Sequence, residues 1–388
     1  MPDLAQITKA LAGRAEHYDR TASFPADSIA AIHDAGLLTA TVHRRYGGRG
    51  AGLAETAVIL RALGQGDPSA ALITAMTMFA HALQGIEPTW PDDVYATAVA
   101  EAAHRPVLIN ALRVEPELGT PARGGLPATV ASPDGGRWSL TGHKIFSTGA
   151  EGLRWMVVWA RVGDTQEARG FLVRSDSPGI RIERTWDHLG LRASRSDDVL
   201  FASTPAVPAA GSGGGPAFMA WNSLGLTSLY LGVAAAARDW LVSFLTERSP
   251  ASLGRPLATL PRFQAAVGEI DASLGAAVAL VDATAARVDD GDTAAAALAP
   301  AVKLTGTGAA VDAVSQAVAL VGNNGLTRRN PLERHLRDVL CARVHTPQDD
   351  SIVAAAGRAA FPGLYQGIRP LPPGPEPTPR ESIRGTAA

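Results

Sequence analysis

Residues 330–350, NPLERHLRDVLCARVHTPQDD, predict a helix that runs directly into a group of ionisable and polar side chains. Asn330 is a favourable N-cap, Pro331 suits the first helical position, and Glu333 stands where a capping box places its carboxylate. Pro347 is expected to stop this helix. We therefore expect one wall of a site at the C-terminal end of the helix.

The charged residues within this helix have a simple structural interpretation. Glu333 with Arg337, and Arg334 with Asp338, are opposite charges four residues apart, a spacing typical of salt bridges on a solvated or inter-subunit face. Any chemistry is therefore expected after the helix, in a cluster that comprises His345, Thr346, Gln348, Asp349 and Asp350.

Composition indicates an ordinary soluble protein of two or three domains or layers. The chain has 388 residues, of which 46% are hydrophobic and 19% charged, with a net charge of −2. Its basic residues do not cluster, so a nucleic-acid partner is not expected. The single cysteine, Cys341, excludes an intrachain disulfide and a cysteine-built metal site, which fits a reducing cytoplasm, and no metal is expected.

A membrane span is not expected either. The N-terminus carries Asp3 and Lys9 instead of a basic flank followed by an apolar run. The most apolar windows, residues 71–83 and 224–237, fall short of the ~20 residues that a transmembrane helix needs. We infer a cytoplasmic protein.

The chain divides by its texture into an α+β arrangement of three domains and a tail. Residues 1–105 are alanine-rich with helical periodicity, interrupted at Pro25, the Gly47-Gly48 turn, Pro68 and Pro91. Residues 106–208 contain short β-rich runs with turn signals and predict a small antiparallel β domain; the clearest runs are residues 137–140, 155–162, 170–174, 180–186 and 198–202.

A low-complexity loop at residues 209–216 precedes the third domain. Long apolar-periodic helices follow from about Phe218, with breaks near residues 249–260 and 289–292, and predict a four-helix bundle over residues 209–362. The Pro-rich tail, residues 363–388, has too little apolar surface to order itself without a partner.

Four motifs resemble one known family in this order. They are EHYDRTASFPADSIAAIHDAGLLTATVHRRYGGRG (residues 16–50), TGHKIFSTGA (141–150), WDHLGLRASRSDDVLF (186–201) and QAVALVGNNGL (316–326). Together with the domain order, they resemble the acyl-CoA dehydrogenase fold over residues 4–362. The resemblance implies a flavin cofactor.

The second motif matches the family's flavin-facing strand. The resemblance implies that Phe146 lies against the flavin ring, that Ser147 belongs to the same contact, and that Thr148 hydrogen-bonds near flavin N5. On the residues alone, this stretch could also be an ordinary β-branched strand. Gly119 and Thr120 match the family's loop over the pyrophosphate, for which the alternative is an ordinary turn.

Two further regions match the family's contacts to the dinucleotide end of FAD. Arg248 aligns with the phosphate-binding arginine, although Arg255 or a plain surface arginine would also satisfy the pattern. The Gly-rich turn implies contacts to a neighbouring subunit's cofactor, or simply a helix-ending loop, and its candidate residues are Gln316, Gly322, Asn323 and Gly325. The choice between FAD and FMN stays open.

The sequence departs from the family at the catalytic base. Thr346 stands where the family has its usual glutamate, and the alternative carboxylate position falls near Asn222 and Ser223. Removing the α-proton of an acyl thioester requires a base within reach. Asp349 or Asp350 could supply one only from a displaced position.

This departure resembles the two-component flavin monooxygenases of the same fold, such as dibenzothiophene monooxygenases. They receive reduced flavin from a separate reductase and carry a histidine after the same helix, which His345 resembles. The alternative is a histidine bound at a helix end. His81, on an apolar helix, is the second catalytic candidate, although such a residue is more often a satisfied core histidine.

Three functions therefore remain: a monooxygenase using reduced flavin, O2 and a small organic substrate, a desaturase with a relocated base, and a non-catalytic assembly partner. The first is favoured, because the usual base is absent while Phe146, Thr148 and His345 are present. A flavin reductase is the implied protein partner. A homo-oligomer, most simply a tetramer, is implied because the Gly-rich turn would complete a neighbour's flavin site.

Overall fold

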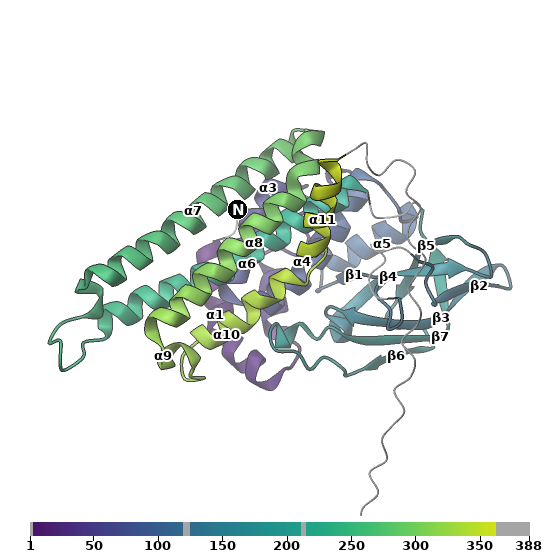
Figure 1. Cartoon of the computed structure of the whole chain (residues 1–388). Helices are drawn as coiled ribbons and strands as arrows, with labels where there is room; N and C mark the ends of the chain where they lie inside the picture. Colours follow the sequence, from purple (N-terminus) through teal and green to yellow (C-terminus); the bar gives the residue numbers. More distant parts are fainter. Residues whose placement is uncertain (1–2, 119–124, 211–214, 362–388) are drawn as a thin grey trace, which may run out of the picture. The chain divides into compact units, whose positions relative to one another are not determined.

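The computed structural model describes residues 3–118, 125–210 and 215–361 (Figure 1). Gly119, Thr120, most of the low-complexity loop and the Pro-rich tail lie outside the described residues. Tertiary contacts group residues 1–349 into one compact unit and residues 350–388 into another. The first two domains expected from the sequence and residues 209–349 of the third belong to the first unit, whereas the last residues of the third belong to the second.

The N-terminal domain is helical, as expected. Its helices are α1 (Leu4–Thr21), α2 (Ala26–Asp34), α3 (Leu53–Gly66), α4 (Pro68–Ile86) and α5 (Asp92–Ala102). The breaks fall at the expected prolines and the expected glycine turn. Helix α4 begins where Asp67 accepts hydrogen bonds from the backbone N–H groups of Ser69 and Ala70, with Pro68 in the first turn.

The middle domain is a seven-stranded sheet beside the helices (Figure 1). Its strands are β1 (Leu108–Leu112), β2 (Val130–Asp134), β3 (Arg137–Ser147), β4 (Leu153–Val162), β5 (Ala168–Arg174), β6 (Ile180–Glu183) and β7 (Asp197–Pro208). Most pairs are antiparallel, but β4 pairs in parallel with both β1 and β2. The sheet is therefore mixed and not the purely antiparallel one that the sequence predicts, because β1 and β2 both run in the same direction as their neighbour β4.

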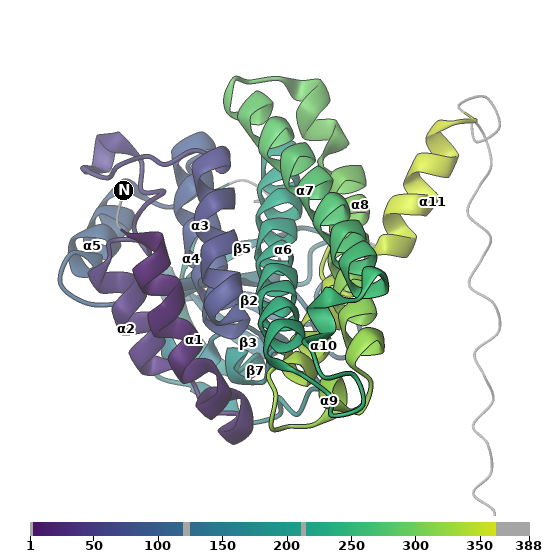
Figure 2. The ribbon, with the colours of Figure 1, turned by 90° about the vertical axis from the view of Figure 1, so that its left-hand side faces the viewer.

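The C-terminal domain is built on three long helices, α6 (Pro216–Glu247), α7 (Pro261–Asp289) and α8 (Thr293–Val321). Short helices follow: α9 (Asn323–Leu326), α10 (Leu332–Leu340) and α11 (Asp349–Ala359). Helix α10 packs against α6 and α8, which completes a helical bundle within the first unit. Helix α6 also lies alongside α3 of the N-terminal domain (Figure 2).

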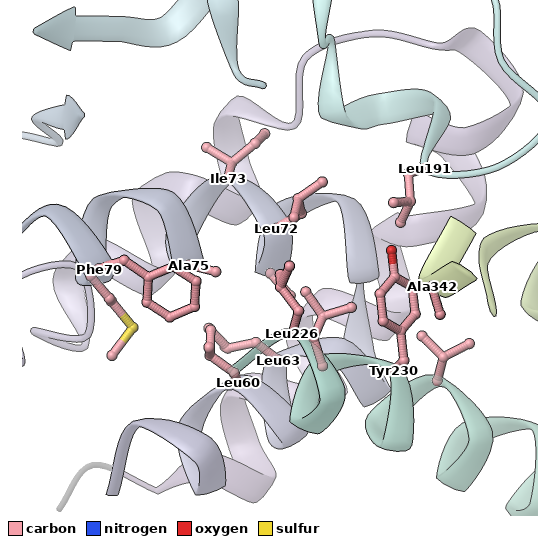
Figure 3. Packing of buried hydrophobic residues seen from close by; sticks show 14 of the residues in the cluster. Leu60, Leu63, Leu72, Ile73, Ala75, Phe79, Leu191, Leu226, Tyr230 and Ala342 are labelled. Atoms are coloured by element: carbon pink, nitrogen blue, oxygen red, sulfur yellow. The ribbon is translucent and has the colours of Figure 1, made fainter. Parts of the chain in front are cut away.

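Two glycines allow α3 and α6 to approach closely. A Cβ added to Gly64 would overlap the carbonyl oxygen of Leu229, and one added to Gly232 would overlap the carbonyl oxygen of Arg61. Fully buried leucines, among them Leu60, Leu63 and Leu226, fill the space beside this contact (Figure 3). The N-terminal and C-terminal domains therefore share one hydrophobic core.

Gly232→Ala is expected to destabilise the protein by about 1–3 kcal/mol, because the added methyl group can be accommodated only if the helices move apart. Urea unfolding measures the change. Gly268→Ala in α7 is the matched control: its Cβ meets no atom within 4 Å, so it should be neutral or slightly stabilising. Equal effects of the two substitutions would show that the close helix contact is unimportant.

The structure corrects several expectations for residues 330–350. Helix α10 begins after Pro331, and the Asn330 side chain donates to the Asn324 carbonyl at 2.9 Å instead of capping the helix. The helix ends at Leu340 and continues as a 3-10 turn, well before Pro347. Both predictions failed because tertiary contacts of this segment override its local capping signals.

The charge pairs within α10 also differ from expectation. Glu333 does pair with Arg337, at 2.8 Å. Asp338, however, accepts a hydrogen bond from the Leu191 backbone, and both Arg334 and Asp338 are buried. This face of α10 is therefore packed against the protein and is not the solvated face that the spacing indicated.

Three helices, α4, α7 and α8, are long and apolar enough to cross a membrane by length and composition. The sequence-based statement that apolar stretches are too short is therefore wrong. Within the fold, 72% of the apolar window of α4 is buried in protein, which gives its composition a structural cause. The expected absence of a membrane partner stays a prediction.

Candidate functional site

The end of strand β3 presents an aromatic surface. The register between β3 and β7 shifts between Lys144 and Ser147, and Phe146 takes a positive φ of 55° there. Such a backbone is unusual for a bulky residue, and it leaves the Phe146 side chain 52% exposed. Trp186 and His188 stack at 3.6 Å and meet the Phe146 ring edge-on. Together these three rings form the aromatic face.

A chain of hydroxyl groups lies beside the aromatic face. Thr148 is buried, and its Oγ1 lies 3.0 Å from Ser196 Oγ, which lies 2.9 Å from Ser194 Oγ. The Asn110 side chain donates to the Thr148 carbonyl at 3.1 Å. Ser147 Oγ is buried and has no hydrogen-bond partner among the described residues. At this turn the Ser147 hydroxyl is therefore unsatisfied, whereas the Thr148 hydroxyl is fixed in position by Ser196.

The segment after β6 joins the aromatic face to helix α10. Trp186 Nε1 donates to the Leu191 carbonyl at 3.0 Å, and the Leu191 N–H donates to Asp338 Oδ1 at 2.7 Å. Burial raises the pKa of Asp338 to about 7. Gly190 lies so close to the Arg337 carbonyl that a side chain would not fit. These contacts fix Trp186 relative to the helix that precedes His345.

His345 is held by a buried tyrosine that the sequence analysis did not identify. Its Nδ1 lies 2.6 Å from the hydroxyl of Tyr230, which is fully buried in α6. Figure 3 shows this hydroxyl directed toward Leu191. Burial and the nearby Lys303 ammonium lower the pKa of His345 to about 4, so the imidazole is neutral at pH 7.

The tautomer of His345 follows from its partner. Burial raises the pKa of Tyr230 well above its usual value, so this hydroxyl keeps its proton. Within the part of the chain that the structure describes, His345 Nδ1 is its only recorded hydrogen-bond partner. We infer that Tyr230 donates to Nδ1, which leaves the single imidazole proton on Nε2.

The two positions considered for a catalytic carboxylate meet in the structure. The Asn222 side-chain amide, on α6, donates to the backbone carbonyl of Thr346. Neither residue can act as a carboxylate base. Asp349 is the first acidic residue that follows Thr346 in the sequence. Its Oδ1 lies 3.2 Å from Nζ of the fully buried Lys303. That carboxylate is therefore engaged by an ammonium group.

His81 lies in a closed core. It is 0% exposed, and its Nδ1 lies 2.8 Å from the hydroxyl of Tyr95, on α5. Burial lowers the pKa of His81 to about 4, and its Nε2 has no partner among the described residues. This geometry matches the core-histidine interpretation and does not bring His81 to the aromatic face.

The residues expected at the dinucleotide end of a cofactor are spread over the far ends of the long helices. Arg248 and Arg255 are exposed in the loop between α6 and α7. Gln316 donates to Glu269 Oε2, on α7, at 3.0 Å. Gly322 has a φ of 56°, whereas Asn323 and Gly325 belong to the short helix α9. The residue with positive φ in this turn is therefore Gly322.

The sequence alone does not identify Tyr230 and Lys303 as site residues. They lie on α6 and α8 within long apolar helical patterns, and the one signal that could have indicated them is a polar side chain at a core position. From its sequence context alone, Trp186 is interpreted as a residue of the β-domain core or of the flavin edge, with the core preferred. The structure places it on the aromatic face.

Comparisons with known proteins agree with this architecture. Family models for acyl-CoA dehydrogenase match the chain in three parts: the N-terminal domain over residues 5–86, the middle domain over 113–204 and the C-terminal domain over 224–349. YdbM of Bacillus subtilis, a protein named as an acyl-CoA dehydrogenase, is 32% identical over 368 residues, which cover 93% of this chain and 96% of that protein.

Two solved structures extend the comparison. FMN-bound TdsC from Paenibacillus sp. A11-2, a dibenzothiophene monooxygenase, has a TM-score of 0.83 at 19% identity, covering 92% of this chain and 96% of its own. KijD3, in complex with FMN and a dTDP-linked amino sugar, has a TM-score of 0.76 at 26% identity and covers 92% of each chain. At 19% identity, the similarity to TdsC shows the fold alone.

The fold and the site thus define a flavin-dependent oxidoreductase. The chain belongs to the acyl-CoA dehydrogenase family.

The residues present fit a flavin. A flat ring system needs an exposed apolar surface and polar groups at its edge, and Phe146 and Trp186 supply the former while Thr148 supplies the latter. Ser147 Oγ, which is buried without a partner, adds an unsatisfied polar group at the same turn. We expect Phe146, Ser147, Thr148 and Trp186 to hold the ring, as the sequence indicated for the first three.

Proposed function

We propose that this protein is a monooxygenase that uses reduced flavin and O2 to oxygenate a small organic substrate. When bound, the reduced flavin supplies the two electrons that the reaction requires. The observation that carries the proposal is the contact between Asn222 and Thr346. These are the two positions at which the family resemblance places the base for acyl-CoA oxidation, and neither Asn222 nor Thr346 is a carboxylate.

His345 is the group that we assign to hydrogen bonding at the reacting centre. Its neutral imidazole carries a proton on Nε2, because Tyr230 occupies Nδ1. Nε2–H can therefore donate a hydrogen bond near neutral pH, which would stabilise negative charge that develops on oxygen during oxygen transfer. It cannot remove a carbon-bound proton in that tautomer. The arrangement consequently favours oxygen transfer over dehydrogenation.

A desaturase is the second candidate, because YdbM, a relative of nearly full coverage, is named as an acyl-CoA dehydrogenase. This function would require a displaced carboxylate. Asp349 would first have to be released from Lys303. KijD3, which is 26% identical and was solved with FMN, makes FMN a cofactor to test beside FAD.

We further propose a homo-oligomer, most simply a tetramer, that receives its flavin from a separate reductase. Only 28% of the apolar window of α7 is buried within the chain, so much apolar helix surface is available to another copy. Light scattering of the full chain measures the mass directly. A monomer that binds flavin at micromolar affinity would contradict the shared flavin site.

Anaerobic titration with reduced and oxidised FMN and FAD tests the proposed reaction. We expect tighter binding of the reduced form, because the enzyme must capture it from the reductase and shield it from water. Mixing with O2 should then produce a transient spectrum that differs from both reduced and oxidised flavin. Bleaching of bound oxidised flavin by short-, medium- or long-chain acyl-CoA, without a reductase, would instead establish dehydrogenation.

A further inference from the structure

A cavity of about 510 Å³ lies at the N-terminal end of α10, the opposite end of the helix from His345. It is formed by α1, the segment before β7 and the turn that leads into α10. Six arginines and three carboxylates line it, which leaves a formal excess of three positive charges. The arginines are Arg20, Arg192, Arg328, Arg329, Arg334 and Arg337. We call this space the arginine cavity.

The three carboxylates are already engaged. Asp19 and Glu333 both pair with Arg337, at 2.7 and 2.8 Å. Glu16 pairs with Arg20 at 2.5 Å. Among the described residues, Arg20 and Arg337 are the partners of these carboxylates, and Arg192 lies 4.0 Å from Asp187, outside the cavity. The positive excess therefore belongs mainly to Arg328, Arg329 and Arg334.

Arg334 gives the clearest indication of a missing anion. Its side chain is only 8% exposed, yet its Nε is buried without a hydrogen-bond partner, and the structure records no ion pair for it among the described residues. The buried carboxylates of Asp67 and Asp338 influence it electrostatically but form no ion pair with it. A buried guanidinium without a close counter-ion is costly.

Two other features add positive potential to the same cavity. Helix α10 has no side-chain cap at its N-terminus, because Asn330 bonds to Asn324 instead. Its first backbone N–H groups and the positive end of its dipole therefore remain available. Arg328 and Arg329 are exposed at the rim and form no recorded ion pair in the described part of the chain.

We propose that the arginine cavity binds the phosphate or pyrophosphate group of a small molecule. Guanidinium groups and an uncapped helix N-terminus are the donors that phosphate oxygens prefer. An excess of three charges suits a multiply charged anion, and the volume exceeds what a single carboxylate would fill. The proposal does not depend on the oxygenation reaction, since the cavity and His345 lie at opposite ends of α10.

Isothermal titration of the full chain with inorganic phosphate, pyrophosphate and ADP tests this site. We expect binding, with pyrophosphate or ADP tighter than phosphate. Stronger binding of ADP indicates a nucleotide, and equal binding indicates a free anion. The double variant Arg328→Gln/Arg329→Gln and the single variant Arg334→Met should each weaken binding by at least ~10-fold, because charge-assisted hydrogen bonds are lost.

The matched control is Arg137→Gln/Arg181→Gln, which removes the same charge from exposed positions of the β domain. It should leave the affinity unchanged. Equal weakening by the control would mean a nonspecific charge effect and would overturn the proposal. The absence of binding in wild type would also overturn the proposal. In that case the charge of Arg334 would be balanced by the carboxylates of Asp67 and Asp338 alone. Loss of pyrophosphate binding after saturation with flavin would assign the cavity to the cofactor instead.

The folding of Arg334→Met can be checked separately from binding. If this variant fails to fold, the exposed rim pair still decides the question, because Arg328 and Arg329 are not part of the core. The affinity for flavin, measured through the absorption of the bound flavin, provides a further readout. It should be the same in the rim variant and in wild type. A changed flavin affinity would show that the rim belongs to the cofactor site.

Discussion

His345→Gln is expected to lower turnover by ~10²–10³-fold once the substrate is known, because losing one positioned hydrogen-bond donor to charge that develops in the transition state usually costs that much. Glutamine keeps the approximate size and polarity of the side chain but cannot titrate. Flavin affinity and the oligomer should persist, since the aromatic face on β3 does not include His345. Steady-state kinetics with the reductase present measures the loss.

Tyr230→Phe tests how His345 is positioned. Phenylalanine preserves the packing of this fully buried ring but removes the hydroxyl 2.6 Å from Nδ1. The imidazole can then adopt either tautomer, so turnover should fall by ~10-fold or more, by less than in His345→Gln. The pH profile separates this effect from simple loss of structure: the limb due to His345, expected near pH 4, should move in Tyr230→Phe and vanish in His345→Gln.

The second histidine–tyrosine pair provides a close comparison. His81 Nδ1 likewise lies within hydrogen-bond distance of a tyrosine hydroxyl, that of Tyr95 at 2.8 Å, but in a closed core. His81→Gln should therefore reduce stability and leave kcat nearly unchanged. Most wild-type turnover remaining in His345→Gln, together with its loss in His81→Gln, would transfer the catalytic role to His81.

Lys144→Met is expected to destabilise the protein by about 3–5 kcal/mol, the second large effect. Lys144 Nζ lies 2.5 Å from Glu115 Oε1, and both side chains are almost completely buried. Glu115 also accepts backbone hydrogen bonds from Ala128 and Thr129. Burial raises the pKa of Glu115, but these bonds and the Lys144 ammonium outweigh it and hold that pKa below its usual value. Removing the lysine leaves a buried carboxylate without its counter-ion.

The double variant Glu115→Gln/Lys144→Met distinguishes this explanation from a loss of packing. Glutamine keeps the acceptor for one backbone N–H but removes the buried charge, so the double variant should recover part of the lost stability. Chemical unfolding of the three proteins gives the interaction energy through a double-mutant cycle. If the double variant is no more stable than Lys144→Met, the buried charge is not the cause.

Local patterns determined the order of the elements. Helical periodicity with proline and glycine breaks located the helical N-terminal domain, and the break expected at Pro68 is where α4 begins. β-rich runs with turn signals located the middle domain, and the family resemblance indicated the strand that carries Phe146 and ends at Ser147. These features depend on residues close in sequence, so the sequence contains the information needed to place them.

Tertiary structure alone decided the details of the candidate site. The parallel pairing of β4 with β1, the burial of Arg334 and Asp338, and the start of α10 at Leu332 all depend on contacts between segments far apart in sequence. His345 could be identified from its position after a helix. Its partner, Tyr230, lies 115 residues away, and only the packing of α6 against this segment brings the two side chains together and thereby sets the protonation of the imidazole.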